Sequence, residues 1–389
     1  MSLFSKLIEA IEMSSQIKKQ NQKRENDEDS SEQNKRQKIE VPEEEADATT
    51  KLTDVVDDCL VHIFKHLMLR DLINLADTCT RFQPAAESTF EAKCRGKKIK
   101  IRLDHNSNRM QPVKLLDNAT IEISDLSSAL KVLRHFGSMI PKLSIYFHDK
   151  NMDRNAEVAR YMNEFCANSL IDIEMIDATK QVVANWTKPF ANAESIHLWR
   201  SNLGDLNAWF PKIRRLKIFA TAREYGCEKE GVTDILRLNQ NLQKLRIGGS
   251  VFDIKCLENV SGYLQSIRIL DLSCYDGFFN LEGRSIHFKS VKELYIWNYV
   301  NPVPKIPLSF DQLEKIQFTV RKLDLNDNFK RFVRQNPLLK TLKIFFEESA
   351  GNTVSIEQIK LDLAAEFEGV AVDLKQRHSG LKEIKFVPI

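Results

Sequence analysis

The sequence predicts an α/β fold in which three short helices precede a horseshoe-shaped solenoid of strand–helix repeats. Apolar residues recur at helical spacing between Leu52 and Cys94, and a short apolar motif recurs from Lys97 onward. The 389 residues, 42% of them hydrophobic, are enough for two or three domains. We therefore divide the chain at residues 1–50, 51–96 and 97–389.

The N-terminal region is predicted to be largely disordered. Residues 14–50 contain almost no large apolar side chains, so they cannot bury enough surface to offset the entropy of ordering. Residues 1–13 form a candidate amphipathic helix that fits a partner groove or a membrane surface, and a frayed tail is an equal alternative.

Two basic clusters in this region resemble a bipartite nuclear localisation signal, whose partner is an import receptor. They are separated by a ten-residue acidic and polar spacer, and an ordinary solvated charge run explains them equally well. The expected location is therefore the nucleus, the cytoplasm or both. The cluster residues are Lys23, Arg24, Lys35, Arg36 and Lys38.

Three short helices are predicted between Leu52 and Cys94. We expect Asp57 or Asp58 to cap the first and Asp71 to cap the second, while Pro84 begins the third. Helices this short are marginal alone, so they must pack on one another and on a partner. The apolar stripes are Leu60, Ile63, Phe64 and Leu67, then Leu72, Leu75, Ala76 and Cys79, then Phe82, Ala86 and Phe90.

The spacing of this segment resembles the F-box family, in Asp57–Leu67 and again in Leu72, Cys79 and Phe82. Two departures stand out: the family prefers Leu-Pro at Val55-Val56 and often has Trp at Phe82. The resemblance implies docking to a Skp-type adaptor, which tethers a cullin scaffold and its RING partner. The residues it assigns to docking or packing are Val55, Val56, Leu60, Ile63, Phe64, Leu67, Leu72 and Phe82.

From Lys97 onward an apolar residue, two spacers, an apolar residue, one spacer and another apolar residue recur. The period of 22–29 residues between the middle positions 216, 245, 270, 294, 316 and 342 resembles leucine-rich repeats. The turn residues Thr221, Ser250, Tyr275, Tyr299 and Glu347 depart from the usual Asn or Cys, so the array is irregular. A doubly wound α/β domain is the alternative, although it needs longer crossovers.

The motif copies, named by their last two apolar positions, extend to both ends of this region. The clear copies are Leu216/Ile218, Leu245/Ile247, Leu270/Leu272, Leu294/Ile296, Ile316/Phe318, Leu342/Ile344 and Ile384/Phe386. The weaker ones are Ile101/Leu103, Ile121/Ile123, Leu143/Ile145, Ile171/Ile173 and Ile196/Leu198. Helices are expected between them at Ser127–Phe136, which Gly137 ends in a left-handed conformation, and at Asp153–Asn168, Asn328–Asn336 and Ser355–Phe367.

Two columns of side chains are predicted on the concave face of the solenoid, where such arrays bind their partners. Their mixture of aromatic rings, Lys and Arg suits a protein surface, and it also suits stacking of single-stranded RNA. A register slip would instead turn the rings into core. The candidate binding residues are Tyr146, His197, Trp199, Lys217, Phe219, Arg246, Tyr295, Trp297 and Phe345, with Ser144, Gly248, Asp271, Ser273, Gln317, Thr319 and Lys343 completing the columns.

No catalytic motif is found, so we expect no enzyme activity, no cofactor, no metal and no small-molecule ligand. His62 and His66 have metal-compatible spacing but lack a third ligand, and the seven scattered cysteines indicate reduced thiols. No apolar run reaches membrane-spanning length, and the net charge of +3 indicates no field that would attract nucleic acid.

The two resemblances together imply a substrate receptor of a cullin-RING ubiquitin ligase, which presents a protein for ubiquitination and proteasomal degradation. Such a receptor acts by proximity and supplies no reacting group. The alternative is a nuclear repeat protein that binds RNA or a ribonucleoprotein, with the F-box-like helices as a cap of the solenoid.

Overall fold

The computed structural model forms two compact units. One consists of residues up to Arg95 with Arg134–Phe136, and the other of Gly96–Leu133 with Gly137–Ile389. The structure describes residues 55–103, 113–117, 119–147, 152–201, 208–219, 233, 236–237, 239–249, 255–258, 260–274, 285–298, 306–320, 327–347, 370–376 and 381–388. The predicted N-terminal helix, disordered region, nuclear signal and helix 355–367 therefore lie outside the described residues.

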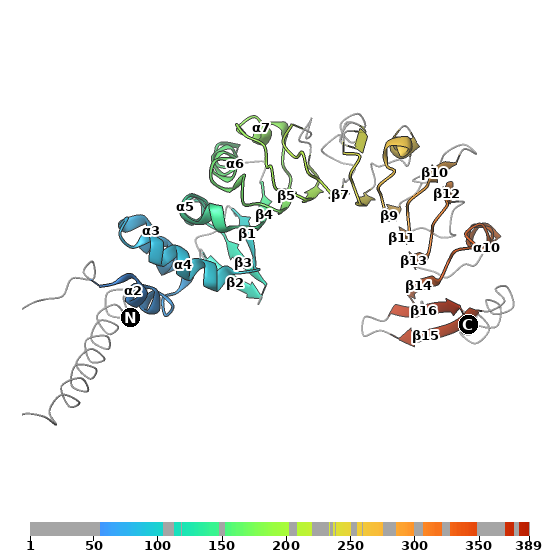
Figure 1. Ribbon diagram of the computed structural model, residues 1–389, viewed down its shortest axis with the longest axis horizontal. Helices are drawn as coiled ribbons and strands as arrows, with labels where there is room; N and C mark the ends of the chain where they lie inside the picture. Colours follow the sequence, from blue (N-terminus) through green and yellow to red (C-terminus); the bar gives the residue numbers. More distant parts are fainter. Residues whose placement is uncertain are drawn as a thin grey trace, which may run out of the picture. The chain divides into compact units, whose positions relative to one another are not determined.

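The first unit contains the three predicted helices, α2 (Asp57–Phe64), α3 (Leu69–Thr78) and α4 (Gln83–Cys94) (Figure 1). Their apolar stripes face one another, and the rings of Phe64 and Phe82 meet edge to face with centroids 5.9 Å apart. Pro84 lies in the first turn of α4, as predicted, because its missing N–H has no acceptor there.

The predicted caps are wrong. Val56 and Met68 occupy the cap positions of α2 and α3, and neither side chain accepts a hydrogen bond. The acidic residues lie one position or more inside the helices, where their charge still favours the positive end of the helix dipole. Cys79 ends α3 with an extended backbone and is not part of its helical stripe.

Within the residues that the structure describes, the second unit is built on one sheet of fourteen strands, in which most neighbours are parallel. From β4 to β14 the strands that belong to this sheet follow one another in sequence order. They are β1 (Lys98–Arg102), β2 (Val113–Asp117), β3 (Thr120–Ile123), β4 (Lys142–Tyr146), β5 (Asp172–Ile176), β6 (Ser195–Trp199), β7 (Arg215–Phe219), β8 (Lys244–Gly248), β9 (Ile269–Cys274), β11 (Glu293–Asn298), β13 (Lys315–Val320), β14 (Thr341–Glu347), β15 (Val370–Gln376) and β16 (Leu381–Pro388).

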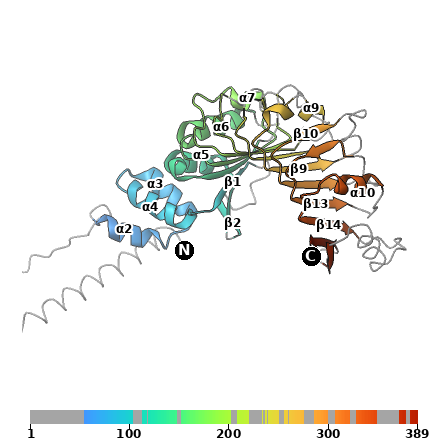
Figure 2. The same cartoon turned by 45° about the vertical axis from the view of Figure 1, so that its right-hand side comes forward.

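Short connecting elements lie between these strands. The helices α5, α6 and α7 lie along one side of the sheet (Figures 1 and 2), and the predicted helices 127–136, 153–168 and 328–336 form α5, α6 and α10 with slightly different ends. The elements are α5 (Leu126–Phe136), η4 (Gly137–Met139), α6 (Met152–Cys166), α7 (Lys180–Val183), α9 (Lys255–Glu258), η5 (Ser261–Tyr263) and α10 (Asp327–Arg334), with a separate parallel pair, β10 (Ile286–Phe288) and β12 (Leu308–Phe310).

Three of the predicted motif copies have the wrong register or direction. Ile99 and Ile101 pair with Leu143 and Ile145, so the pair Ile101/Leu103 was placed two residues too late. In β5 the inward pair is Ile173/Met175, and Ile171 is 44% exposed. The copy at Ile384/Phe386 lies on β16, which runs antiparallel to β14, because an apolar spacing carries no information on strand direction.

Both ends of the sheet carry antiparallel strands. At the first end β3 pairs with β1 in parallel, and β2 turns back along β3. At the other end β16 turns back along β14, and β15 turns back along β16. The parallel part of the sheet is therefore enclosed between two hairpin-like ends.

Gly137 ends α5, but not in the predicted left-handed conformation. Its φ is −56°, an ordinary right-handed value, and the chain continues into η4. A side chain is excluded here by packing, because a Cβ would lie 2.8 Å from Cys166 Sγ and 2.9 Å from Phe165 Cβ. The residue that does cap α5 is Asp125, whose carboxylate accepts from Ser128 N at 2.8 Å.

Candidate functional site

The eight residues assigned to docking fall into two groups in the first unit. Leu60, Ile63, Phe64, Leu67, Leu72 and Phe82 are at most 8% exposed and form the core between the helices. Val55 is half-buried, whereas Val56 is 62% exposed. Of these eight residues, only Val55 and Val56 can therefore contact a partner while the three helices stay folded.

Met68 is a further exposed apolar residue that the sequence pattern did not single out. It is 66% exposed and occupies the cap position of α3, as Val56 does in α2. Cys59 and Val61 on α2 are half-buried. We call Val56 and Met68 the exposed apolar pair of this unit.

Arg81, in the connection between α3 and α4, contacts the start of α2. Its guanidinium forms an ion pair with Asp57, and Nη2 donates to the Val55 carbonyl at 3.2 Å. The sequence pattern did not assign a role to Arg81. Its contacts hold the backbone next to Val56 in place.

In the second unit, the predicted columns lie in register on the face of the sheet opposite α5, α6 and α7. Tyr146, Ile176, Trp199, Phe219, Gly248, Ser273, Trp297, Thr319 and Phe345 are aligned strand by strand. The neighbouring column contains Ser144, Glu174, His197, Lys217, Arg246, Asp271, Tyr295, Gln317 and Lys343.

We call this surface the open face. It also includes the outward residue at the start of each of the ten strands β1, β4–β9, β11, β13 and β14, because side chains two apart share a face. Basic residues outnumber acidic ones on it. The acidic residues are Asp172, Glu174, Asp271 and Glu293, and the basic ones are Lys98, Lys100, Arg102, Lys142, Arg215, Lys217, Lys244, Arg246, Lys315 and Lys343.

The aromatic rings of the open face are half-buried rather than fully exposed. Neighbouring parallel strands are about 4.8 Å apart, so large side chains in one column cover each other. The ring centroids of Trp199 and Phe219 are 4.9 Å apart. Phe219 also lies over Gly248, where a Cβ would be 2.5 Å from the Phe219 ring.

Glu174 is one of the residues of the open face that the sequence pattern did not single out. It accepts from Lys98 Nζ at 2.6 Å, from Ser144 Oγ at 2.7 Å and from Trp199 Nε1 at 2.9 Å. Burial alone would raise the pKa of Glu174, but these donors and the Lys98 charge hold it below its ordinary value. The signal was the glutamate between the two inward residues of β5, which the register error concealed.

Beside this cluster lie Lys217 and His197. Lys217 Nζ lies 4.2 Å from the centroid of the Trp199 ring, which is a cation–π contact. Burial and the positive charge of Arg246 lower the pKa of Lys217. Burial also lowers the pKa of His197, whose Nε2 lies 3.3 Å from Ser195 Oγ.

Further along the sheet, Arg246 contacts two neighbours. Its Nε lies 3.4 Å from Asp271 Oδ2, and its guanidinium carbon lies 5.4 Å from the centroid of Trp297. Burial raises the pKa of Asp271 although Arg246 opposes the shift. Arg246 and Asp271 therefore neutralise each other's charge only in part, and Arg246 also contacts the half-buried ring of Trp297.

Tyr295 belongs to a third cluster of the open face. Its hydroxyl donates to Glu293 Oε2 at 2.5 Å and accepts from Lys315 Nζ at 2.7 Å, while Lys315 also reaches Glu293 at 2.9 Å. The Tyr295 hydrogen bond, followed by Lys315, lowers the pKa of Glu293. The charges of Glu293 and Lys315 therefore balance each other.

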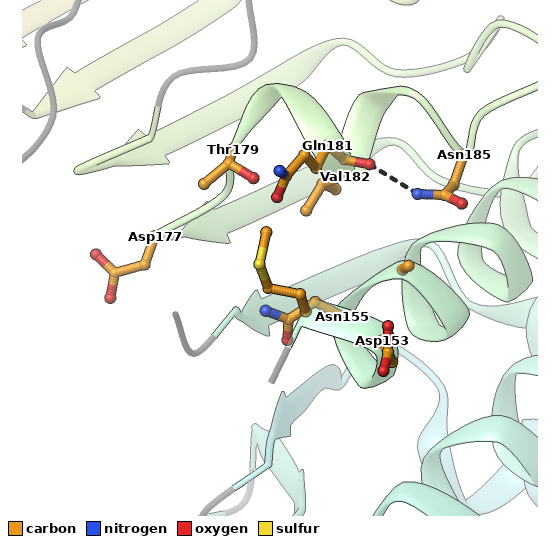
Figure 3. A pocket seen from close by; sticks show the side chains of 9 residues that line it. Asp153, Asn155, Asp177, Thr179, Gln181, Val182 and Asn185 are labelled. Carbon is orange, nitrogen blue, oxygen red and sulfur yellow. Dashed lines mark hydrogen bonds between the residues drawn. The ribbon is translucent and has the colours of Figure 1, made fainter. Parts of the chain in front are cut away.

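A pocket of about 340 Å³ lies at the carboxyl end of β5, between the start of α6 and α7. Asn155 faces Gln181 and Val182 across it (Figure 3). Asp177 at its rim is already held by Arg200, whose Nε and Nη2 donate to its two oxygens at 2.8 Å each. One of the two carboxylates that line the pocket is thus engaged within the fold, and the other is that of Asp153.

Neither a metal centre nor a membrane span is found in the described part of the chain. Its residues contain no group of three His, Cys, Asp or Glu that could hold a metal ion. Among its helices, none is long and apolar enough to cross a membrane.

Comparison with protein families identifies residues 52–88 as an F-box domain. This match covers α2, α3 and the first half of α4, within the segment that the sequence pattern had singled out, and F-box domains bind Skp-type adaptors. A search of the curated proteins gives no match to the chain.

Proposed function

Because residues 52–88 are an F-box domain, we propose that the chain is a non-catalytic substrate receptor of a cullin-RING ubiquitin ligase. The F-box docks a Skp-type adaptor, and the open face of the second unit holds the protein to be ubiquitinated. The family match is the observation that carries this proposal.

The second unit acts in this proposal as a divergent leucine-rich-repeat array. Nine strands from β4 to β14 follow one another in parallel, in sequence order, with a connection of only one repeat between neighbours. A doubly wound domain would place strands of the second half on the other side of the first. The sequential order supports the repeat interpretation.

The exposed apolar pair supports a docking role for the F-box. Leaving two large apolar side chains in water at the starts of neighbouring helices gains nothing for folding, and a partner surface would bury them. The six buried residues hold the three helices together and so act on docking indirectly.

In this proposal the chain contributes proximity to the ligase reaction. Holding a substrate lysine near the ubiquitin-charged enzyme raises its effective concentration. Action in the nucleus, the cytoplasm or both, with import mediated by the basic clusters, is part of the same proposal.

The test is co-purification of the full chain with a Skp-type adaptor. Val56→Asp/Met68→Asp should abolish the complex while the circular dichroism spectrum stays unchanged. The matched control, Ser88→Asp/Ala92→Asp, adds the same two charges to exposed positions of α4 and should bind normally. A folded wild-type chain that binds no adaptor would contradict the proposal.

A further inference from the structure

Four basic side chains form a compact group on β7 and β8, near the middle of the open face. Arg215 pairs in register with Lys244, and Lys217 pairs with Arg246. Side chains opposite each other on parallel strands are about 5 Å apart, and those two apart along a strand about 7 Å. We call these four residues the cation square.

Most of this charge is left unbalanced. Within the described part of the chain, neither Arg215 nor Lys244 forms an ion pair, and both are exposed. Arg246 has one acidic contact, Asp271 on β9, at 3.4 Å. Like charges placed directly opposite on neighbouring strands destabilise a sheet, so the square costs folding free energy that a bound anion would offset.

Acidic residues lie two strands away from the square on each side. Glu174 on β5 and Glu293 on β11 are each held by a lysine, at 2.6 Å and 2.9 Å. The excess of positive charge is therefore only about two strands wide, or roughly 10 Å. This width fits two or three consecutive residues of an extended peptide.

An apolar contact lies beside the square. Trp199 and Phe219 form a half-buried ring pair at the carboxyl ends of β6 and β7, and the absence of a side chain at Gly248 allows Phe219 to lie over β8. Rigid rings of this kind supply contact area to a peptide at low entropic cost.

From this arrangement we infer that the open face recognises a short cluster of Asp and Glu residues in its protein substrate, next to one apolar side chain. The acidic residues would bind the cation square, and the apolar one would lie on the Phe219 side of the Trp199–Phe219 pair, because Lys217 contacts the Trp199 ring. This inference rests on the proposed function of the open face and specifies the class of its substrate.

Two observations favour this ligand over single-stranded RNA and over one phosphate group. Ring faces that bases would need are already contacted by cations, Lys217 on Trp199, Arg246 on Trp297 and Lys315 on Tyr295. The four cations are spread over about 5 Å by 7 Å on two neighbouring strands, whereas a single phosphate group is best held by donors that converge on it.

The test is selection of random dodecapeptides displayed on phage against the immobilised complex of the full chain with its adaptor. We expect enrichment of peptides with two or three neighbouring Asp or Glu residues beside a Leu, Ile or Phe. The best peptide should bind at least 10-fold more tightly than its Gln/Asn counterpart, with affinity falling as salt rises.

Arg215→Gln/Lys244→Gln should reduce the affinity of the best peptide about 10-fold. The matched control is Arg214→Gln/Arg268→Gln, which removes the same charge from exposed residues lining a groove of about 620 Å³ at the amino ends of the strands. The control should bind normally, because these side chains lie off the open face. Equal losses in both variants would overturn the inference.

Other outcomes separate this inference from the proposed function. Enrichment of non-acidic peptides whose binding is lost in Trp199→Ala would overturn the acidic class and leave the open face as the substrate site. Exclusive binding of phosphoserine peptides or of a uridine dodecamer would also overturn it. Failure to enrich any peptide on an adaptor-bound chain would contradict both the acidic substrate class and the use of the open face as the substrate site.

Discussion

The indole N–H of Trp199 donates to the carboxylate of Glu174 at 2.9 Å, across the boundary between two neighbouring strands. The same carboxylate receives Lys98 and Ser144, so one acidic group connects three side chains from three other strands. Since Trp199 also contacts Lys217, the Glu174 cluster fixes the edge of the surface on which the peptide is expected to lie.

Glu174→Gln should lower the free energy of unfolding of the second unit by about 1 kcal/mol, because it leaves Lys98 without its anion in a site partly open to solvent. Urea unfolding followed by tryptophan fluorescence measures the change. Glu314→Gln is the control, since that carboxylate pairs with Lys292 and Lys340 but is 33% exposed, against 18% for Glu174. An unchanged midpoint for Glu174→Gln would show that the cluster is not stabilising.

Acidification should destabilise the second unit, in part through His197. Its folded-state pKa lies below the ordinary 6.5, so the unfolded chain binds the proton first and stability is lost as pH falls below 6.5. The lowered pKa of Glu174 adds a loss at lower pH in the same direction. His197→Gln should flatten the dependence of the urea midpoint on pH just below 6.5, and an unchanged slope there would contradict the assignment.

Gly137→Ala should destabilise the second unit by about 1–3 kcal/mol, because its Cβ would enter the space filled by Cys166 and Phe165. Gly262→Ala is the matched control, since a Cβ there meets nothing within 4 Å. Thermal unfolding of the two variants should differ clearly. Equal melting temperatures would mean that the end of α6 moves aside at little cost.

Phe64→Ala should cost the first unit about 3–5 kcal/mol, because a fully buried ring in a thin core is removed. We expect loss of helix by circular dichroism together with loss of adaptor binding. Val56→Asp/Met68→Asp should lose binding alone. If Phe64→Ala stayed helical, its ring would be required for binding directly.

Much of the open face could be predicted from the sequence. Side chains alternate along a strand, so two inward apolar residues determine which of the residues beside them point outward. Trp199, Phe219 and Trp297 were placed in one column on that basis, and the strands align them. The same rule failed in β5, where Ile171, Ile173 and Met175 all fit the pattern and only pairing with β4 decides between them. Glu174 was missed for this reason.

The helix caps and the last strand could not be predicted for different reasons. Asp57 and Asp58 are equally good caps when the sequence is considered alone. In the structure α2 begins earlier than either cap requires, so that Val56 occupies the cap position. The direction of β16 depends on a hydrogen-bond partner far away in sequence, and apolar spacing is the same for both directions.

The antiparallel strands at both ends of the sheet limit how the array can grow. A further parallel repeat added beyond β2 would meet a strand of the wrong direction, and one added beyond β15 would be separated from the parallel strands by the reversed strand β16, so in neither place would its covering helix continue the array. Longer or shorter relatives of this chain should therefore gain or lose repeats between β4 and β14. The gain or loss of a repeat would change the distance from the cation square to the two ends of the sheet. It would therefore also change the length of substrate that the open face can span.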